Sequence, residues 1–120
     1  MLYLIGRHPF IKLEVKLPEK RWIEIDCLID TGFSGGLVLP KKFKESFLED
    51  EFIEARFVLA NGSEIMAEAS YTKVRYKKIE KEVAVVFMGD SEGLVGVEFL
   101  DQMKFCLDLK KNKVELFAYS

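Results

Sequence analysis

The alternation of apolar and charged side chains over residues 11–29 restricts the possible folds of this 120-residue chain more than any other feature. In residues 11–17 every second side chain is apolar, and the side chains between them are Lys or Glu. Pro18 interrupts this pattern, which resumes at Ile23 and becomes apolar on both faces at residues 27–29. Because successive side chains of a strand point to opposite faces, these two runs predict a hairpin whose second strand enters the core.

Most of the remaining chain also has the pattern of strands. We expect a short core strand at residues 37–39, a hairpin from residue 55 with its turn at Asn61 and Gly62, and a strand at 71–76 paired with 82–87. A closing hairpin is expected at 106–109 and 114–117. Asn-Gly favours a type I′ turn, because both residues tolerate positive φ.

Two short segments predict helices. Residues 97–103 carry Phe99, Leu100 and Met103 at helical spacing, and a one- or two-turn helix is expected from Pro40 to about residue 48, with Phe43 and Phe47 on one face. The fold class is therefore all-β and mainly antiparallel, in one domain spanning residues 1–120, since the chain is too short for two well-packed cores.

The charge balance excludes a broad basic or acidic surface. The 18 basic and 20 acidic residues are interspersed, so we expect no nucleic-acid or membrane partner. The basic residues around the predicted turn at 77–78 are expected to form a solvated face. No signal-like segment and no apolar stretch of about 20 residues is present, so the expected location is the cytoplasm.

Residue types that often bind metals are sparse and scattered. Cys27 and Cys106 lie in apolar, strand-like segments and are expected to be buried and reduced. His8 is the single histidine and has no nucleophile or acid at motif spacing, and Trp22 is expected to pack at an edge. The sequence therefore predicts no metal and no cofactor.

A carboxylate, Asp30, directly follows the buried run at residues 27–29. Burying an unpaired charge is costly, so this aspartate should be partnered, partly hydrated or used in chemistry. An Asp before Thr-Gly more commonly caps a turn, and this structural interpretation stands beside the catalytic one.

Three features together resemble the retropepsin family of aspartic proteases. Residues 28–34 (LIDTGFS) match its hydrophobic-hydrophobic-Asp-Thr-Gly-x-Ser motif, residues 56–67 resemble its flap hairpin, and residues 94–96 (LVG) match its hydrophobic-hydrophobic-Gly motif before a helix. The resemblance covers nearly the whole chain and is greatest to single-domain prokaryotic members. It implies a closed, barrel-like acid-protease fold that acts as a homodimer, because one chain carries only one of the two required aspartates.

The resemblance also implies roles for individual residues. Asp30 would be catalytic, Thr31 would bond across the dimer axis, Gly32 would allow close backbone approach, and Ser34 would steady Asp30. The flap over the substrate would carry Asn61 and Gly62 at its tip, and the supporting motif would be Leu94, Val95 and Gly96. Phe33 departs from the viral pattern, in which a small Ala is common, and the flap tip has one glycine where viral flaps have several.

The function implied is hydrolysis of peptide bonds by water activated between two Asp30 carboxylates, with a peptide or protein as substrate and no cofactor. One alternative is a catalytically silent dimerisation or peptide-binding module of the same fold. A phosphoryl-transfer reading through an aspartyl nucleophile fits less well, because Asp26 lies four residues from Asp30 and no second acidic motif is apparent.

Overall fold

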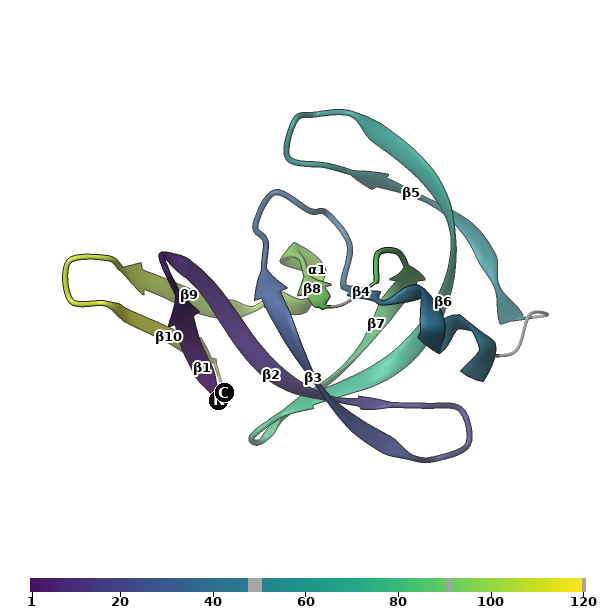
Figure 1. The fold of residues 1–120 in the computed structure, drawn as a ribbon, viewed down its shortest axis with the longest axis horizontal. Helices are drawn as coiled ribbons and strands as arrows, with labels where there is room; N and C mark the ends of the chain where they lie inside the picture. The colour runs from purple at the N-terminus through teal and green to yellow at the C-terminus, as the bar shows by residue number, and fades with distance from the viewer. Residues whose placement is uncertain (48–50, 91, 120) are drawn as a thin grey trace.

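The computed structural model describes residues 1–47, 51–90 and 92–119, and it is mainly β-structure (Figure 1). The strands are β1 (Leu2–Ile5), β2 (His8–Lys16), β3 (Trp22–Ile29), β4 (Leu37–Leu39), β5 (Ile53–Val58), β6 (Glu64–Tyr76), β7 (Ile79–Phe87), β8 (Gly93–Val95), β9 (Met103–Asp108) and β10 (Lys113–Ala118). The first eight form one sheet in the order β1-β2-β3-β8-β4-β7-β6-β5. A further pairing of β2 with β6 closes six of these strands into a barrel, so both the mainly β structure and the closed barrel that were expected are present.

The predicted hairpin at residues 11–29 is confirmed as β2 and β3, which pair antiparallel from Phe10 opposite Leu28 to Lys16 opposite Trp22. The apolar side chains of β2 at alternate positions point inward and are buried in the barrel. The core of the barrel consists mainly of aliphatic side chains from six strands. The alternating apolar residues of β2 are therefore the side chains that face the barrel interior.

Side chains reinforce the seam where β2 meets β6. The Arg75 guanidinium donates two hydrogen bonds to the Glu14 carboxylate, at 3.1 and 3.0 Å, and these bonds hold the pKa of Glu14 below its ordinary value. The same guanidinium lies 4.0 Å from the centre of the Trp22 ring. Thr72 Oγ1 donates to the carbonyl oxygen of Lys16. Trp22 therefore packs at the barrel edge, as expected.

The hairpin of β5 and β6 has the predicted location but a different turn. Gly62 has a positive φ of 85°, whereas Asn61 is absent from the positive-φ residues, so the turn is not the predicted type I′. The Gly62 N–H donates to Leu59 O, and the Leu59 N–H donates to Ser63 O, which makes a three-residue loop. Strand β6 also begins at residue 64 and runs unbroken through the strand predicted at 71–76.

Both predicted helices are present, but they differ from the prediction in type or in length. The segment after Pro40 is a 3₁₀ helix, η1 (Lys41–Ser46), and the predicted end near residue 48 lies outside the described residues. Helix α1 (Val97–Leu100) is a single turn, because Gln102 adopts a positive φ of 66° and β9 begins at Met103. The prediction of a helix through Met103 is therefore wrong.

Lys81 does not lie on a solvated face, contrary to the sequence prediction. Its ammonium donates to the carbonyl oxygens of Glu98, Phe99 and Asp101, at 3.2, 2.8 and 2.8 Å. Burial lowers the pKa of this ammonium. The side chain thus satisfies backbone acceptors at the end of α1, which explains how so short a helix is tied to β7.

The first and last strands lie together at one side of the barrel (Figure 1). Strand β1, which the sequence did not predict, pairs with β2 and contacts β10. Strands β9 and β10 form a separate two-stranded sheet, the predicted closing hairpin. No helix in the described part of the chain is long and apolar enough to cross a membrane.

Both cysteines are free, as expected, but only one is fully buried. Cys27 lies in the barrel core, and burial raises the pKa of its thiol to about 12. Cys106 is half-buried in β9. The Cys27 thiol is therefore a packing group, since a nucleophilic cysteine needs an accessible thiolate.

Candidate active site

Strand β8 positions the candidate site by lying between β3 and β4. It pairs parallel with β3 and antiparallel with β4, although β3 and β4 are close in sequence and β8 is about sixty residues away. The loop of residues 30–36 must therefore pass over the end of β8. The two motifs singled out in the sequence, at 28–34 and 94–96, meet there.

Backbone hydrogen bonds lock these two motifs together. The Asp30 N–H donates to Val95 O at 2.9 Å, and the Gly96 N–H donates to Gly36 O at 3.1 Å. The first residue of α1 continues the pattern, with the Val97 N–H donating to Phe33 O at 3.0 Å. The loop that carries Asp30 is thus held along its length by the segment that precedes and begins α1.

Gly96 is required by this close approach. A Cβ atom at this position would meet the carbonyl oxygens of Phe33 and Gly35 well inside van der Waals contact. Gly96 is also buried. Its predicted supporting role therefore has a steric basis, since no other residue lets the two segments pack so closely.

The Asp30 side chain is half-buried at the end of β3. Its Oδ1 accepts a hydrogen bond of 2.9 Å from the Gly32 N–H. A Cβ atom on Gly32 would lie 2.6 Å from Ala60 Cβ, at the tip of the β5–β6 hairpin. Gly32 therefore allows the hairpin tip to lie directly against the loop that carries the carboxylate.

Ser34 forms two hydrogen bonds to the β5–β6 hairpin. Its Oγ accepts a hydrogen bond of 2.9 Å from the Val58 N–H, and its own N–H donates to Val58 O at 3.1 Å. The group that bonds to Asp30 is the Gly32 N–H. Ser34 therefore fastens the β5–β6 hairpin to the Asp30 loop.

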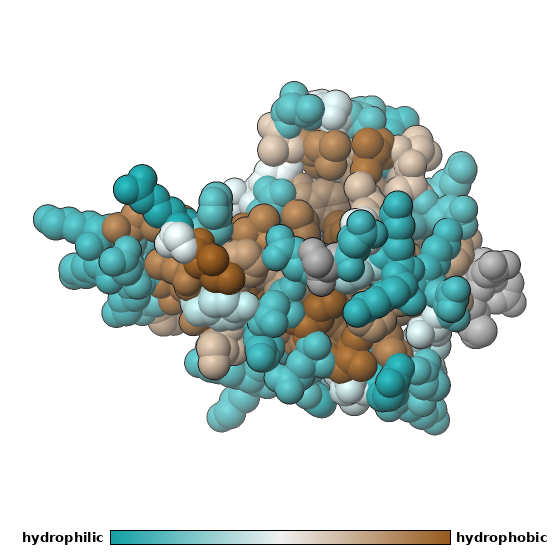
Figure 2. Space-filling model, in the orientation of Figure 1, coloured by the Kyte–Doolittle hydropathy of each residue, from teal (hydrophilic) through white to brown (hydrophobic). Residues whose placement is uncertain are grey.

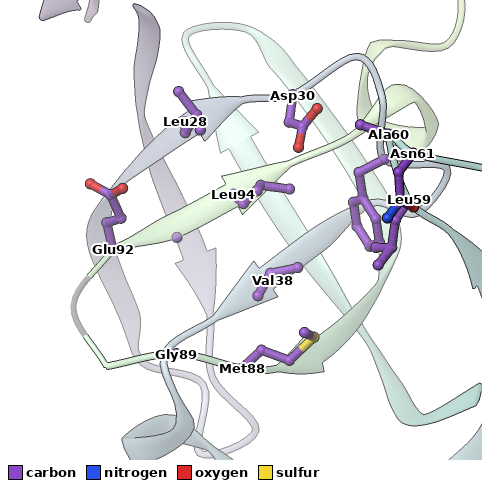
Figure 3. A pocket seen from close by; sticks show the side chains of 12 residues that line it. Leu28, Asp30, Val38, Leu59, Ala60, Asn61, Met88, Gly89, Glu92 and Leu94 are labelled. Atoms are coloured by element: carbon purple, nitrogen blue, oxygen red, sulfur yellow. The ribbon is translucent and has the colours of Figure 1, made fainter. Parts of the chain in front are cut away.

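A cleft of about 570 Å³ opens beside Asp30 (Figure 3). Leu28, Leu94 and Val38 lie side by side on neighbouring strands and form its floor, as their strand registers require. Asp30 and the hairpin tip stand at one end of the cleft, and Glu92 stands at the other. The described residues that line the cleft are Leu28, Asp30, Phe33, Val38, Leu59, Ala60, Asn61, Met88, Gly89, Glu92, Gly93 and Leu94.

The structure brings together part of the predicted site. Asp30, Asn61 and Leu94 line the cleft, whereas Gly62 shapes the turn behind it and Val95 is buried in the barrel core. Thr31 is exposed and lies outside the cleft.

Sequence reasoning missed several lining residues. Leu59 and Ala60 precede the predicted turn, and their place in a three-residue loop could not be read from the Asn-Gly pair. Met88, Gly89 and Glu92 follow a strand and sit in a polar-looking loop, where no local pattern signals a cleft.

A second hollow, of about 390 Å³, lies on the other side of the Asp30 loop. It is lined by Arg7, His8, Pro9, Leu28, Ile29, Asp30, Thr31, Phe105 and Leu107. Asp30 therefore borders both the cleft and an outer surface that β9 helps to form. Figure 2 shows apolar surface gathered near the join of the β9–β10 hairpin with the barrel, while the tip of that hairpin is hydrophilic.

Phe33, which departs from the viral pattern, does not obstruct the cleft. Its ring is buried and stacks on Phe57, with the ring centres 5.5 Å apart. The two rings belong to a second apolar cluster that includes Ala69 and Val86. The bulky side chain therefore supports the hairpin from beneath.

Within residues 1–47, 51–90 and 92–119, no three or more His, Cys, Asp or Glu side chains are grouped so that they could hold a metal ion. No protein-family model matches the sequence, and no curated protein matches it either.

Proposed function

We propose that this chain is one half of a homodimeric, retropepsin-like aspartic endopeptidase in which the two Asp30 carboxylates activate a water molecule. The observation that carries the proposal is the position of Asp30 between two hollows. On one side is an apolar cleft under a hairpin, suited to an extended peptide, and on the other is an open surface suited to a second copy.

The hairpin above the cleft supports a peptide substrate. Its tip, Leu59 to Asn61, forms one wall, and backbone groups of a hairpin can bind an extended chain by adding it as a strand. The two hydrogen bonds between Ser34 and Val58 hold the base of this hairpin beside Asp30. A substrate in the cleft would therefore be shielded from bulk water.

The surface beside Thr31 supports the dimer. Leu107 is 41% exposed in the single chain and borders the same hollow as Thr31 and Arg7. A symmetric partner on this face would bring a second Asp30 loop next to the first, because Thr31 directly follows Asp30. The second carboxylate that the chain lacks would come from that partner.

The chemistry follows from two carboxylates in close contact, which share one proton because both cannot be ionised together. The ionised carboxylate takes a proton from the water while the oxygen of that water bonds to the scissile carbonyl carbon. The protonated carboxyl gives its proton to the carbonyl oxygen. When the resulting tetrahedral species collapses, the C–N bond breaks and the nitrogen takes the proton that came from the water. One hydroxyl of that species returns its proton to the other carboxylate, so the pair again holds one proton.

The test is cleavage of a mixed peptide library at acidic to neutral pH by the wild-type chain and by Asp30→Asn. Cleavage should fall by about 10³-fold or more in the variant, with its mass in solution remaining that of a dimer. The matched control is Asp26→Asn, which alters a carboxylate on the same strand that accepts from the Tyr3 hydroxyl at 2.6 Å. This control should retain activity.

A dimer that binds peptides without cleaving them would favour the silent binding module. A monomer at all concentrations, or cleavage that survives Asp30→Asn, would refute the protease proposal outright.

A further inference from the structure

Among the described residues that line the cleft, Glu92 is the one ionisable residue besides Asp30. The remaining lining is apolar apart from Asn61 and the backbone. Glu92 is exposed and directly precedes β8, so its backbone is anchored beside the sheet at the end of the cleft opposite the hairpin tip (Figure 3).

The same residue also borders a neighbouring hollow of about 460 Å³. That hollow is lined by Tyr3, Ile5, Phe10, Glu24, Ile25, Asp26, Lys42, Phe43 and Glu92. Of the residues that the structure describes, only Glu92 belongs to both linings, so its carboxylate stands where the cleft passes into the next surface.

An apolar path crosses this junction. Leu28, on the cleft floor, lies opposite Phe10 in the strand register, and Phe10 lies opposite Tyr3. The Tyr3 and Phe10 rings are stacked, with their centres 5.6 Å apart. Residues directly opposite one another share a face of the sheet, so an extended peptide in the cleft could continue over these rings past Glu92.

The other charged groups around the junction are less suited to bind a substrate. The Asp26 carboxylate accepts the Tyr3 hydroxyl, while Lys42 and Glu24 lie in the neighbouring hollow and do not line the cleft. A cationic side chain leaving the cleft would therefore meet Glu92 first.

We infer that Glu92 is a specificity-determining residue that selects peptides carrying Lys or Arg a short distance from the apolar side chain seated in the cleft. This inference rests on the proposed function only in taking the cleft as the peptide-binding site. An apolar side chain seated in the cleft would place the cation beside the exposed Glu92 carboxylate, and the attraction between these two opposite charges weakens as salt is added.

The test uses fluorogenic peptides with an apolar centre, in which each flanking position carries in turn Lys, norleucine or Glu. Norleucine keeps an apolar chain of similar length and removes the charge. At one flanking position, wild-type kcat/KM should be about fivefold higher with Lys than with norleucine, and the ratio should shrink as salt is added.

Variants assign the preference to one side chain. Glu92→Gln should abolish the Lys preference, so that the kcat/KM ratio of the Lys peptide to the norleucine peptide falls to about one, and Glu92→Lys should turn the preference toward Glu. The matched control is Glu24→Gln, which lies in the neighbouring hollow but outside the cleft, and it should keep the Lys preference. A Lys preference that survives Glu92→Gln, or no Lys preference at any position, would overturn the inference.

A binding arm separates this inference from proteolysis. The same peptides are titrated against the Asp30→Asn variant, with affinity measured by fluorescence anisotropy. Suppose that the wild-type chain cleaves nothing, that the Asp30→Asn variant binds the Lys peptides more tightly than the norleucine peptides, and that adding Glu92→Gln removes this difference. The proposed protease activity would then be refuted, and the inference about Glu92 would stand. If no peptide binds, or binding ignores the charge, the inference fails.

Discussion

The Asp30 loop and the β9–β10 hairpin differ in how tightly the rest of the chain packs against them. The loop is bonded along its length to the segment around Gly96, and a side chain on any of Gly32, Gly35 and Gly96 would collide with a neighbour. The hairpin forms its own two-stranded sheet and leaves apolar side chains exposed, namely Leu107, Leu109, Phe117 and Tyr119. In the proposed dimer, one chain would complete the half-site internally and this outer face would receive the partner.

The largest effect is expected inside the loop. Gly96→Ala should destabilise the fold by about 3 kcal/mol or more, because its methyl group would collide with two backbone carbonyl oxygens that cannot easily move. The free energy of unfolding in urea measures this loss. Gly89→Ala is the control: its φ is 77° but its surroundings are open, so strain alone should cost about 1 kcal/mol. Equal losses in the two variants would show that the loop is not tightly interlocked.

Substitutions on the exposed face of the β9–β10 hairpin should change the dimerisation constant and not the stability of the fold. Leu107→Glu places a charge beside Thr31 in the hollow proposed to receive the partner, and it should weaken dimerisation by about 2 kcal/mol, on the order of 30-fold in Kd. Leu109→Glu is the matched control, because Leu109 is 45% exposed on the same hairpin but does not line the hollow. Sedimentation equilibrium measures both. If the two variants dissociate equally, or neither does, the dimer face lies elsewhere.

A smaller effect is expected where the loop holds the β5–β6 hairpin. Ser34→Ala removes the acceptor of the Val58 N–H and should cost about 1 kcal/mol, with faster hydrogen exchange at that amide. Ser63→Ala removes a hydroxyl that bonds only within the turn, to Asn61 Oδ1 at 2.6 Å, and should leave the Val58 amide protected. Unchanged exchange in Ser34→Ala would mean that packing of the hairpin, and not this bond, holds it down.

The smallest effect is expected at the barrel seam, remote from both regions. Because Arg75 lowers the pKa of Glu14 in the folded chain, the carboxylate stabilises the fold above the ordinary Glu pKa, and that contribution is lost as pH falls through the lowered value. Glu14→Gln should therefore slightly lower the unfolding midpoint at neutral pH and have less effect in acid. Thermal unfolding of wild type and variant at both pH values measures this difference, which would be absent if the exposed pair contributes nothing.

The sequence predicted the β-class, the first and last hairpins and the short strand β4, because each has a local pattern of period two or a recognisable turn. It also marked both segments that meet at Asp30. It overextended α1 to Met103, since helical spacing of apolar residues does not reveal that Gln102 takes a positive φ. It also missed β1, whose apolar residues do not alternate with polar ones.

The site itself depended on contacts that no local pattern encodes. The spacing of residues along the chain does not reveal that β8 inserts between β3 and β4, that Ala60 rests on Gly32, or that Glu92 shares a cleft with Asp30. The sequence by itself determined which side chains of β2 and of the first part of β3 face inward, because that alternation is a property of the extended backbone. Only the tertiary structure decided which strands became neighbours, because strand pairing joins residues far apart in the chain and is settled by packing of the whole barrel.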